Sequence, residues 1–291
     1  MDPVIMVPGL GSDATVWART IKELGPDYKC RVGDTLSDAS LTGMAKRVLD
    51  DAPDRFALAG VSMGGMVAVT IMRLAPERVT RLALFDTNAR ADTPEQAARR
   101  RSSNAAMLAA TDLRALAGPG VAYMVHPRTG QNVRDALASM TVRVGAAVYV
   151  RQNEAVAARD DLFPVLAGIA VPTIVAVGAD DLMTPVAFSR ALADAIAGAE
   201  LHVIPECGHL PPIEKPAATA NLIRAWLRPP LAAIIHQPEA ILCWGGLFSR
   251  DGCASVRVRC HLGSDMRSAR CGGVRGWWKW VTAGYAAPPF S

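Results

Sequence analysis

The amino-acid sequence predicts an α/β fold, built on a mostly parallel sheet with helices on both faces and a helical insertion. Short apolar runs rich in β-branched residues alternate with stretches of helical periodicity, which is typical of a parallel sheet covered on both sides. One long interval, 88–165, has helical spacing and no strand pattern. The chain has 291 residues, of which 51% are hydrophobic and 20% charged, enough for one compact domain of this class.

Six apolar runs are predicted as strands. In chain order they are Val4–Val7, Tyr28–Val32, Phe56–Val61, Val79–Phe85, Thr173–Val177 and Leu201–Ile204. Four segments between them are predicted as helices, namely Leu41–Asp51, Met63–Leu74, Val186–Ile196 and Pro216–Leu227. Thr184 is expected to cap the third helix with Pro185 at its first position, because a hydroxyl accepts from the free N–H groups there and proline fits the first turn.

The predicted α/β core comprises residues 1–87 and 166–228. The insertion 88–165 joins two strands of the sheet, so we expect a lid over the carboxyl edge, where open α/β sheets bind ligands. The alternative is that its helices pack on a sheet face. Residues 229–291 are basic and rich in Cys, Trp and Gly, without a sustained period. They are predicted to be an atypical tail outside the core, with a zinc or DNA-binding module as the alternative.

Charge is unevenly distributed along the chain. Seven of the 31 basic residues and three of the 27 acidic residues lie in 229–291, which leaves 24 of each sign before them. This balance gives no indication of a nucleic-acid or membrane partner. The first eight residues lack the features of a signal peptide, and no stretch approaches the roughly 20 apolar residues that cross a bilayer. Cys30 and Cys207 are well separated and suit a reduced, cytoplasmic protein.

Residues 60–65, Gly-Val-Ser-Met-Gly-Gly, stand between a predicted strand and a predicted helix. A serine with glycine two positions away on each side is typical of the nucleophile elbow of a hydrolase. The backbone turns so sharply there that a side chain at either glycine would collide with its neighbours. The pattern therefore predicts Ser62 as a nucleophile exposed at the edge of the sheet.

The residues that would activate this serine follow at later strand ends. Acyl transfer through serine needs a base, a carboxylate that orients the base, and donors for the oxyanion. Asp181 follows the fifth predicted strand and His209 follows the sixth. Because the carboxyl ends of parallel strands share one edge, we expect both to converge on Ser62. Asp86, at the end of the fourth strand, and Asp180 compete with Asp181 as the acid.

These motifs resemble the α/β-hydrolase superfamily across residues 1–228, where the chain order is serine, acid, histidine. The acid loop Gly-x-x-Asp-x-x-Thr-Pro of that superfamily matches residues 178–185, which favours Asp181 over its neighbour. The Gly-His loop with a downstream Glu-x-Pro matches residues 208–216.

The opening Leu-Gly-Ser-Asp of residues 10–13, followed by Trp17, is similar to that of 3-oxoadipate enol-lactonase-like serine esterases and lactonases. The resemblance implies an oxyanion hole made by the backbone N–H groups of Leu10 and Met63. Trp17 and Met66 are candidates for the wall of the acyl pocket, with core packing as the alternative.

The expected activity is hydrolysis of small to medium carboxylic esters or lactones through an acyl-enzyme, without cofactor or metal. The alternatives on the same fold are a C–C-bond hydrolase, a proton-abstracting synthase and a cofactor-free perhydrolase. A catalytically silent binding protein is the alternative from another class. The partner expected is the small-molecule ester or lactone, and the sequence leaves the oligomeric state open.

Overall fold

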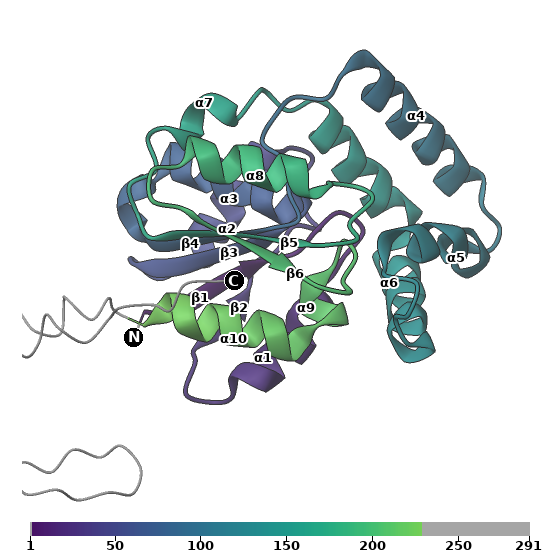
Figure 1. Ribbon diagram of the computed structural model, residues 1–291. Coiled ribbons are helices and arrows are strands. Elements are labelled where there is room, and N and C mark those ends of the chain that lie inside the picture. The colour runs from purple at the N-terminus through teal and green to yellow at the C-terminus, as the bar shows by residue number, and fades with distance from the viewer. Residues whose placement is uncertain (1, 229–291) are drawn as a thin grey trace, which may run out of the picture. The chain divides into compact units, whose positions relative to one another are not determined.

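A six-stranded parallel sheet in the order β2-β1-β3-β4-β5-β6 forms the centre of the structure, a computed structural model that describes residues 2–228 (Figure 1). The predicted tail, 229–291, lies outside the described residues. The strands are β1 Val4–Val7, β2 Cys30–Val32, β3 Phe56–Val61, β4 Val79–Phe85, β5 Thr173–Gly178 and β6 Glu200–Ile204. The six predicted strands are confirmed, with end differences of one or two residues.

The register of the sheet aligns the carboxyl ends of its central strands. Val7 of β1 pairs with Gly60 of β3, and Phe85 of β4 pairs with Val61 on one side and Ala176 on the other. The chain passes from β1 outward to β2 and then returns to β3 on the other side of β1. Such a reversal opens a crevice at the carboxyl edge, where ligands bind in open α/β sheets.

Helices cover both faces of the sheet (Figure 1). Ile5 and Val7 of β1 face one apolar core with α2 and α3, whereas Val4 and Met6 face the other with α1 and α10. This alternation follows from the two-residue period of a strand. The covering helices are α1 Thr15–Leu24, α2 Leu41–Asp51, α3 Met63–Leu74, α8 Val186–Ala195, α9 Pro211–Glu214 and α10 Pro216–Leu227, with a short 3-10 turn at Pro76–Arg78.

The predicted cap of α8 is wrong. The helix begins at Val186, with Pro185 at the capping position and no side-chain cap. The Thr184 hydroxyl instead donates to Asp181 Oδ2 at 2.6 Å. A hydrogen bond to a charged carboxylate is stronger than one to a neutral backbone N–H. The Thr184 hydroxyl therefore bonds within the acid loop and does not cap the helix.

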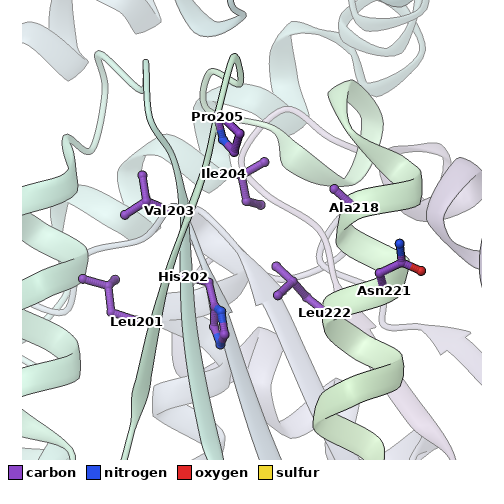
Figure 2. Close-up of a pocket in the computed structure, with 8 residues that line it drawn as sticks. All are labelled: Leu201, His202, Val203, Ile204, Pro205, Ala218, Asn221 and Leu222. Carbon is purple, nitrogen blue, oxygen red and sulfur yellow. The ribbon is translucent and has the colours of Figure 1, made fainter. Parts of the chain in front are cut away.

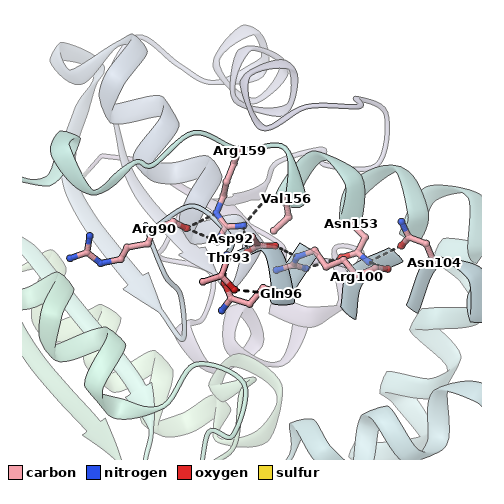
Figure 3. Close-up of polar contacts among 9 residues, drawn as sticks. All are labelled: Arg90, Asp92, Thr93, Gln96, Arg100, Asn104, Asn153, Val156 and Arg159. Carbon is pink, nitrogen blue, oxygen red and sulfur yellow. Dashed lines mark hydrogen bonds and ion pairs between the residues drawn. The ribbon is translucent and has the colours of Figure 1, made fainter. Parts of the chain in front are cut away.

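Between β4 and β5 the chain forms helices only. They are α4 Pro94–Ala109, α5 Leu113–Met124, α6 Gln131–Ala157, which is interrupted at Gly145, and α7 Phe163–Leu166. Asp92, near the start of this insertion, forms buried ion pairs with Arg100 and, at 2.8 Å, with Arg159 near its end (Figure 3). The two ends of the insertion are thereby held together. None of the helices in the described part of the chain has the length and apolar character of a bilayer span.

Candidate active site

The β3–α3 turn holds Ser62 in a strained backbone conformation, with φ 56° and ψ −121°. A non-glycine residue at positive φ persists only where its surroundings enforce it. Gly60 and Gly64 permit the turn. A Cβ at Gly60 would lie 2.3 Å from Gly64 O, and one at Gly64 would lie 2.2 Å from Val7 O. The expected steric reason for the two glycines is therefore confirmed, and the turn presents the Ser62 side chain at the sheet edge.

Ser62, His209 and Asp181 form a continuous hydrogen-bonded array. Ser62 Oγ lies 2.9 Å from His209 Nε2, and His209 Nδ1 lies 2.8 Å from Asp181 Oδ2. The three residues follow β3, β6 and β5, whose carboxyl ends share one edge. His209 and Asp181 are buried at 2% and 4% exposure. The structure thus brings together the three residues that the sequence predicted would converge.

The loop after β5 stabilises Asp181 as a carboxylate. Burial by itself would raise the pKa of Asp181, but hydrogen bonds and charge from His209, together with hydrogen bonds from Thr184, lower it to about 2. Asp181 Oδ1 also accepts from the backbone N–H groups of Met183 and Thr184, at 2.8 and 3.1 Å. An ionised Asp181 places the imidazole proton on Nδ1, which leaves Nε2 free to accept from the Ser62 hydroxyl.

The two competing carboxylates occupy different environments. Asp86 is fully buried, and its Oδ1 accepts from Gly178 N at 2.8 Å. Its Oδ2 has no hydrogen-bond partner among the described residues. Burial, and then the charge of Asp181, raises the pKa of Asp86 well above its usual value. Asp180 is half-exposed and lies 3.8 Å from His126 Nε2. Asp181 is therefore the carboxylate in position to orient His209.

In the described part of the chain, one group of side chains has ligand atoms close enough to hold a metal ion. It consists of Asp86, Asp181 and His209, whose ligand atoms all lie within 4.8 Å of one another. Both imidazole nitrogens of His209 are already hydrogen-bonded, to Asp181 and to Ser62. A metal would have to displace one of these contacts. The group fits the hydrogen-bonded array better than it fits a metal centre.

Glu214 attaches the His209 loop to the connection between α5 and α6. Its Oε1 accepts from Leu210 N at 3.1 Å, and its Oε2 accepts from His126 N at 2.9 Å and Thr129 Oγ1 at 2.8 Å. His209 N also donates to the Met124 carbonyl, at 2.7 Å. The glutamate of the Glu-x-Pro motif therefore supports the histidine, a role that its spacing alone did not reveal.

The loop after β1 lies directly against the serine turn. A Cβ at Gly9 would be 3.2 Å from Ser62 Cβ. Ser12 N donates to Gly9 O at 3.2 Å and Gly11 has φ 68°, so residues 9–12 form a type II turn. Within residues 2–228, neither Leu10 N nor Met63 N donates a hydrogen bond in this arrangement. Both amides therefore lack an acceptor among the described residues, and they stay the predicted donors of the oxyanion hole.

The structure gives Trp17 and Met66 core positions in place of the predicted pocket wall. Trp17 is fully buried, donates from Nε1 to Val7 O at 3.2 Å, and packs edge-on against Phe85 at 5.7 Å between ring centroids. Met66 is 6% exposed and belongs to the opposite core. The packing alternative therefore describes both residues.

A separate groove of about 540 Å³ lies between β6 and α10 (Figure 2). Leu201, His202 and Leu222 line it, and none of Ser62, Asp181 and His209 does. His202 lies 3.4 Å from Glu200 on the same strand. This groove is thus distinct from the candidate active site.

The sequence profile described as "Alpha/beta hydrolase family" matches residues 4–222, and the chain belongs to this family. Among solved structures, it is similar to an esterase from Thermogutta terrifontis (27% identity, TM-score 0.70, covering 78% of this chain and 90% of that one). It is also similar to the enol-lactonase from Burkholderia xenovorans (25% identity, TM-score 0.68, 78% and 92% covered).

A third relative differs in its described chemistry. The chain is 27% identical over 245 residues to the "Putative non-heme bromoperoxidase BpoC" of Mycobacterium tuberculosis, covering 75% of this chain and 90% of that protein. The relatives thus share the hydrolase fold and include esterase, lactonase and bromoperoxidase descriptions.

Proposed function

We propose that the protein is a serine hydrolase that cleaves carboxylic esters or lactones of small to medium size. The observation that carries the proposal is the Ser62–His209–Asp181 array, with spacings of 2.9 and 2.8 Å on the edge of the sheet. A hydroxyl, an imidazole and an ionised carboxylate in this order are the groups that nucleophilic acyl transfer needs.

In the proposed reaction, His209 Nε2 accepts the Ser62 proton as Ser62 Oγ attacks the carbonyl carbon. Asp181 keeps the proton on Nδ1 and stabilises the imidazolium that forms. The N–H groups of Leu10 and Met63 stabilise the negative charge on the tetrahedral oxygen. His209 then protonates the departing alkoxide, leaving an acyl group on Ser62. Water, activated by His209, releases the acid by the same steps.

The proposed small to medium size of the substrate is based on the helical insertion, residues 88–165. We propose that residues 88–165 cover the carboxyl edge as a lid over a modest pocket, and their attachment near His209 through Glu214 supports this placement. Each methylene that fits an apolar pocket contributes on the order of 0.8 kcal/mol, and one that does not fit contributes nothing. Activity toward p-nitrophenyl esters is therefore expected to rise over the first few acyl carbons and then fall.

The test is a panel of p-nitrophenyl esters and lactones run with wild type and Ser62→Ala. Loss of the serine is expected to lower turnover by roughly 10⁶. A tenth of wild-type activity remaining in Ser62→Ala contradicts the mechanism, and a preference for palmitoyl esters contradicts the small pocket.

A second candidate, a cofactor-free perhydrolase, is favoured by the similarity to the bromoperoxidase-named protein. It would use the same acyl-enzyme but release it with hydrogen peroxide in place of water. Peracid formation from an ester and hydrogen peroxide, faster than hydrolysis of the same ester, would select this candidate.

A further inference from the structure

Gln152 is a fully buried polar side chain that joins two loops at the carboxyl edge of the sheet. It lies on the part of α6 that follows the interruption at Gly145. Its Oε1 accepts from Gly11 N at 2.8 Å, and its Nε2 donates to Thr35 O at 2.9 Å. These loops follow the neighbouring strands β1 and β2. Both polar atoms of the amide are therefore hydrogen-bonded. Because the oxygen can only accept and the nitrogen can only donate, these two partners fix the orientation of the amide.

The bond to Gly11 N controls the turn that carries Leu10. In the type II turn of residues 9–12, the Gly11 N–H belongs to the central peptide, and the turn's own hydrogen bond does not use it. Rotation of that peptide would convert the turn to another type. Gln152 Oε1 holds the partly buried Gly11 N–H in one direction, and loss of this acceptor leaves the N–H without a protein partner.

The same turn fixes the direction of the Leu10 N–H. Because a trans peptide is planar, the Leu10 N–H points opposite to the Gly9 carbonyl, which accepts from Ser12 N at 3.2 Å. The Ser12 bond anchors the peptide before Leu10, and the Gln152 bond anchors the peptide after it, so the Leu10 N–H is held between two fixed peptides.

Two other side chains of α6 contact the same loop. Arg143 Nε lies 2.8 Å from Asp13 Oδ2, and Arg143 also donates to Thr15 Oγ1 at 2.9 Å. The ring of Tyr149 lies 3.2 Å from the position of a Cβ on Gly11. The insertion is thus attached to this loop.

We infer that Gln152 is a positioning residue for the oxyanion hole, acting through the Gly11 peptide on the Leu10 N–H. The inference rests on the proposed function, because it assigns no role to Gln152 without an oxyanion at Leu10. Gln152 touches no reacting atom. Its effect is expected in transition-state stabilisation rather than in substrate binding.

The neighbouring residue Asn153 provides a matched control. It is also buried on α6, but its amide bonds to Arg100 and Asn104 within the insertion (Figure 3). Gln152→Met and Asn153→Leu each remove a buried amide while keeping the side-chain size. A purely structural role predicts similar losses of thermal stability and similar kinetics for the two variants.

The experiment measures kcat, KM and phenylboronic acid inhibition with a p-nitrophenyl ester, and the melting temperature, for the full chain. Gln152→Met is expected to lower kcat by about 10- to 100-fold, less than the loss of a whole oxyanion donor, with little change in KM. The affinity for phenylboronic acid should fall in parallel, since its tetrahedral adduct places an oxygen at Leu10. Asn153→Leu should keep both values near wild type.

Gln152→Glu keeps an acceptor for Gly11 N and should retain more kcat than Gln152→Met, so it serves as the test if Gln152→Met does not fold. Equal kcat losses in Gln152→Met and Asn153→Leu, or a loss in KM alone, overturn the inference while the hydrolase function stands. If the wild-type chain turns over no ester or lactone, the proposed function fails and the inference fails with it.

Discussion

The carboxyl group of Asp86 lies beside that of Asp181, with ligand atoms of the two residues and of His209 all within 4.8 Å of one another. The two acids have opposite environments. Asp181 is hydrogen-bonded to His209 and to its own loop, and its pKa is lowered to about 2. Asp86 is fully buried with one oxygen unpartnered among the described residues, and burial raises its pKa. One buried charge beside the imidazole is thus paired, and burial next to that charge disfavours a second.

Asp86→Asn is expected to stabilise the protein at neutral pH. The pKa of Asp86 is higher in the folded state than in the unfolded chain, where it is 3.8. The stability that Asp86 provides is therefore fully present below pH 3.8 and is lost as the pH rises above it, because the unfolded chain then gains stability by ionising. Asparagine is neutral at every pH and can still accept from Gly178 N. The melting temperature of the variant should therefore exceed that of wild type by an amount that grows from pH 4 to pH 7. The corresponding difference in the free energy of unfolding grows by at most about 1.4 kcal/mol per pH unit. A lower melting temperature at pH 7 would mean that Asp86 is ionised in the fold.

Asp181→Asn is expected to lower kcat by about 10⁴, because an amide favours the wrong imidazole tautomer. Asp180→Asn is the matched control, since its half-exposed side chain lies 3.8 Å from His126, whereas Asp181 is the carboxylate that His209 pairs with. It should have a far smaller effect on kcat. A larger loss in Asp180→Asn or Asp86→Asn than in Asp181→Asn would move the acid role to another residue.

Acid should remove the stability that Asp181 contributes. Its folded pKa, about 2, is below the usual value of 3.8, so this contribution is present above pH 3.8 and is lost as pH falls toward 2. Thermal melts of wild type and Asp181→Asn across pH 2 to 6 check this. The difference in melting temperature should be constant above about pH 5 and should shrink below pH 4. A difference independent of pH would show that the carboxylate makes no net charge interaction in the fold.

Gly64→Ala is expected to prevent correct folding. Its Cβ would lie 2.2 Å from Val7 O and 2.6 Å from Pro8 O, both backbone atoms that cannot move aside cheaply. Gly120→Ala is the control. Gly120 is within α5, its Cβ would meet nothing within 4 Å, and alanine there should stabilise the helix by up to about 1 kcal/mol. Soluble yield and melting temperature check the pair; a Gly64→Ala protein as stable as wild type contradicts the packing described for the turn.

Much of the fold could be predicted from the sequence, because its signals are local. Each strand is a short apolar run, and the Gly60–Gly64 spacing reports a steric need inside one turn. Asp181 and His209 could be predicted because both follow strands of a parallel sheet, which fixes the edge on which they meet. The α1 helix was missed, since its apolar positions follow the first loop closely and offer no separate start signal.

Contacts between distant segments could not be predicted. Gly11 and Gln152 are 141 positions apart, and a glutamine within a helical pattern is indistinguishable from a solvated one until the helices are packed. Thr184 followed by proline has the sequence of a helix cap, but its hydroxyl bonds to Asp181, three residues earlier in the same loop, and which of the two local contacts forms depends on the packing of that loop. Trp17 was similarly ambiguous, because a large apolar side chain fits a core and a pocket equally well until its neighbours are known.

The most direct test of the account is covalent labelling of the full chain with a fluorophosphonate, followed by mapping of the modified peptide. The reagent reacts with a serine only where a base activates it and an oxyanion hole receives the phosphoryl oxygen. We predict a single modification, at Ser62, that is accompanied by complete loss of esterase activity and is absent in His209→Ala. An unmodified Ser62 in a chain that still hydrolyses esters would contradict it.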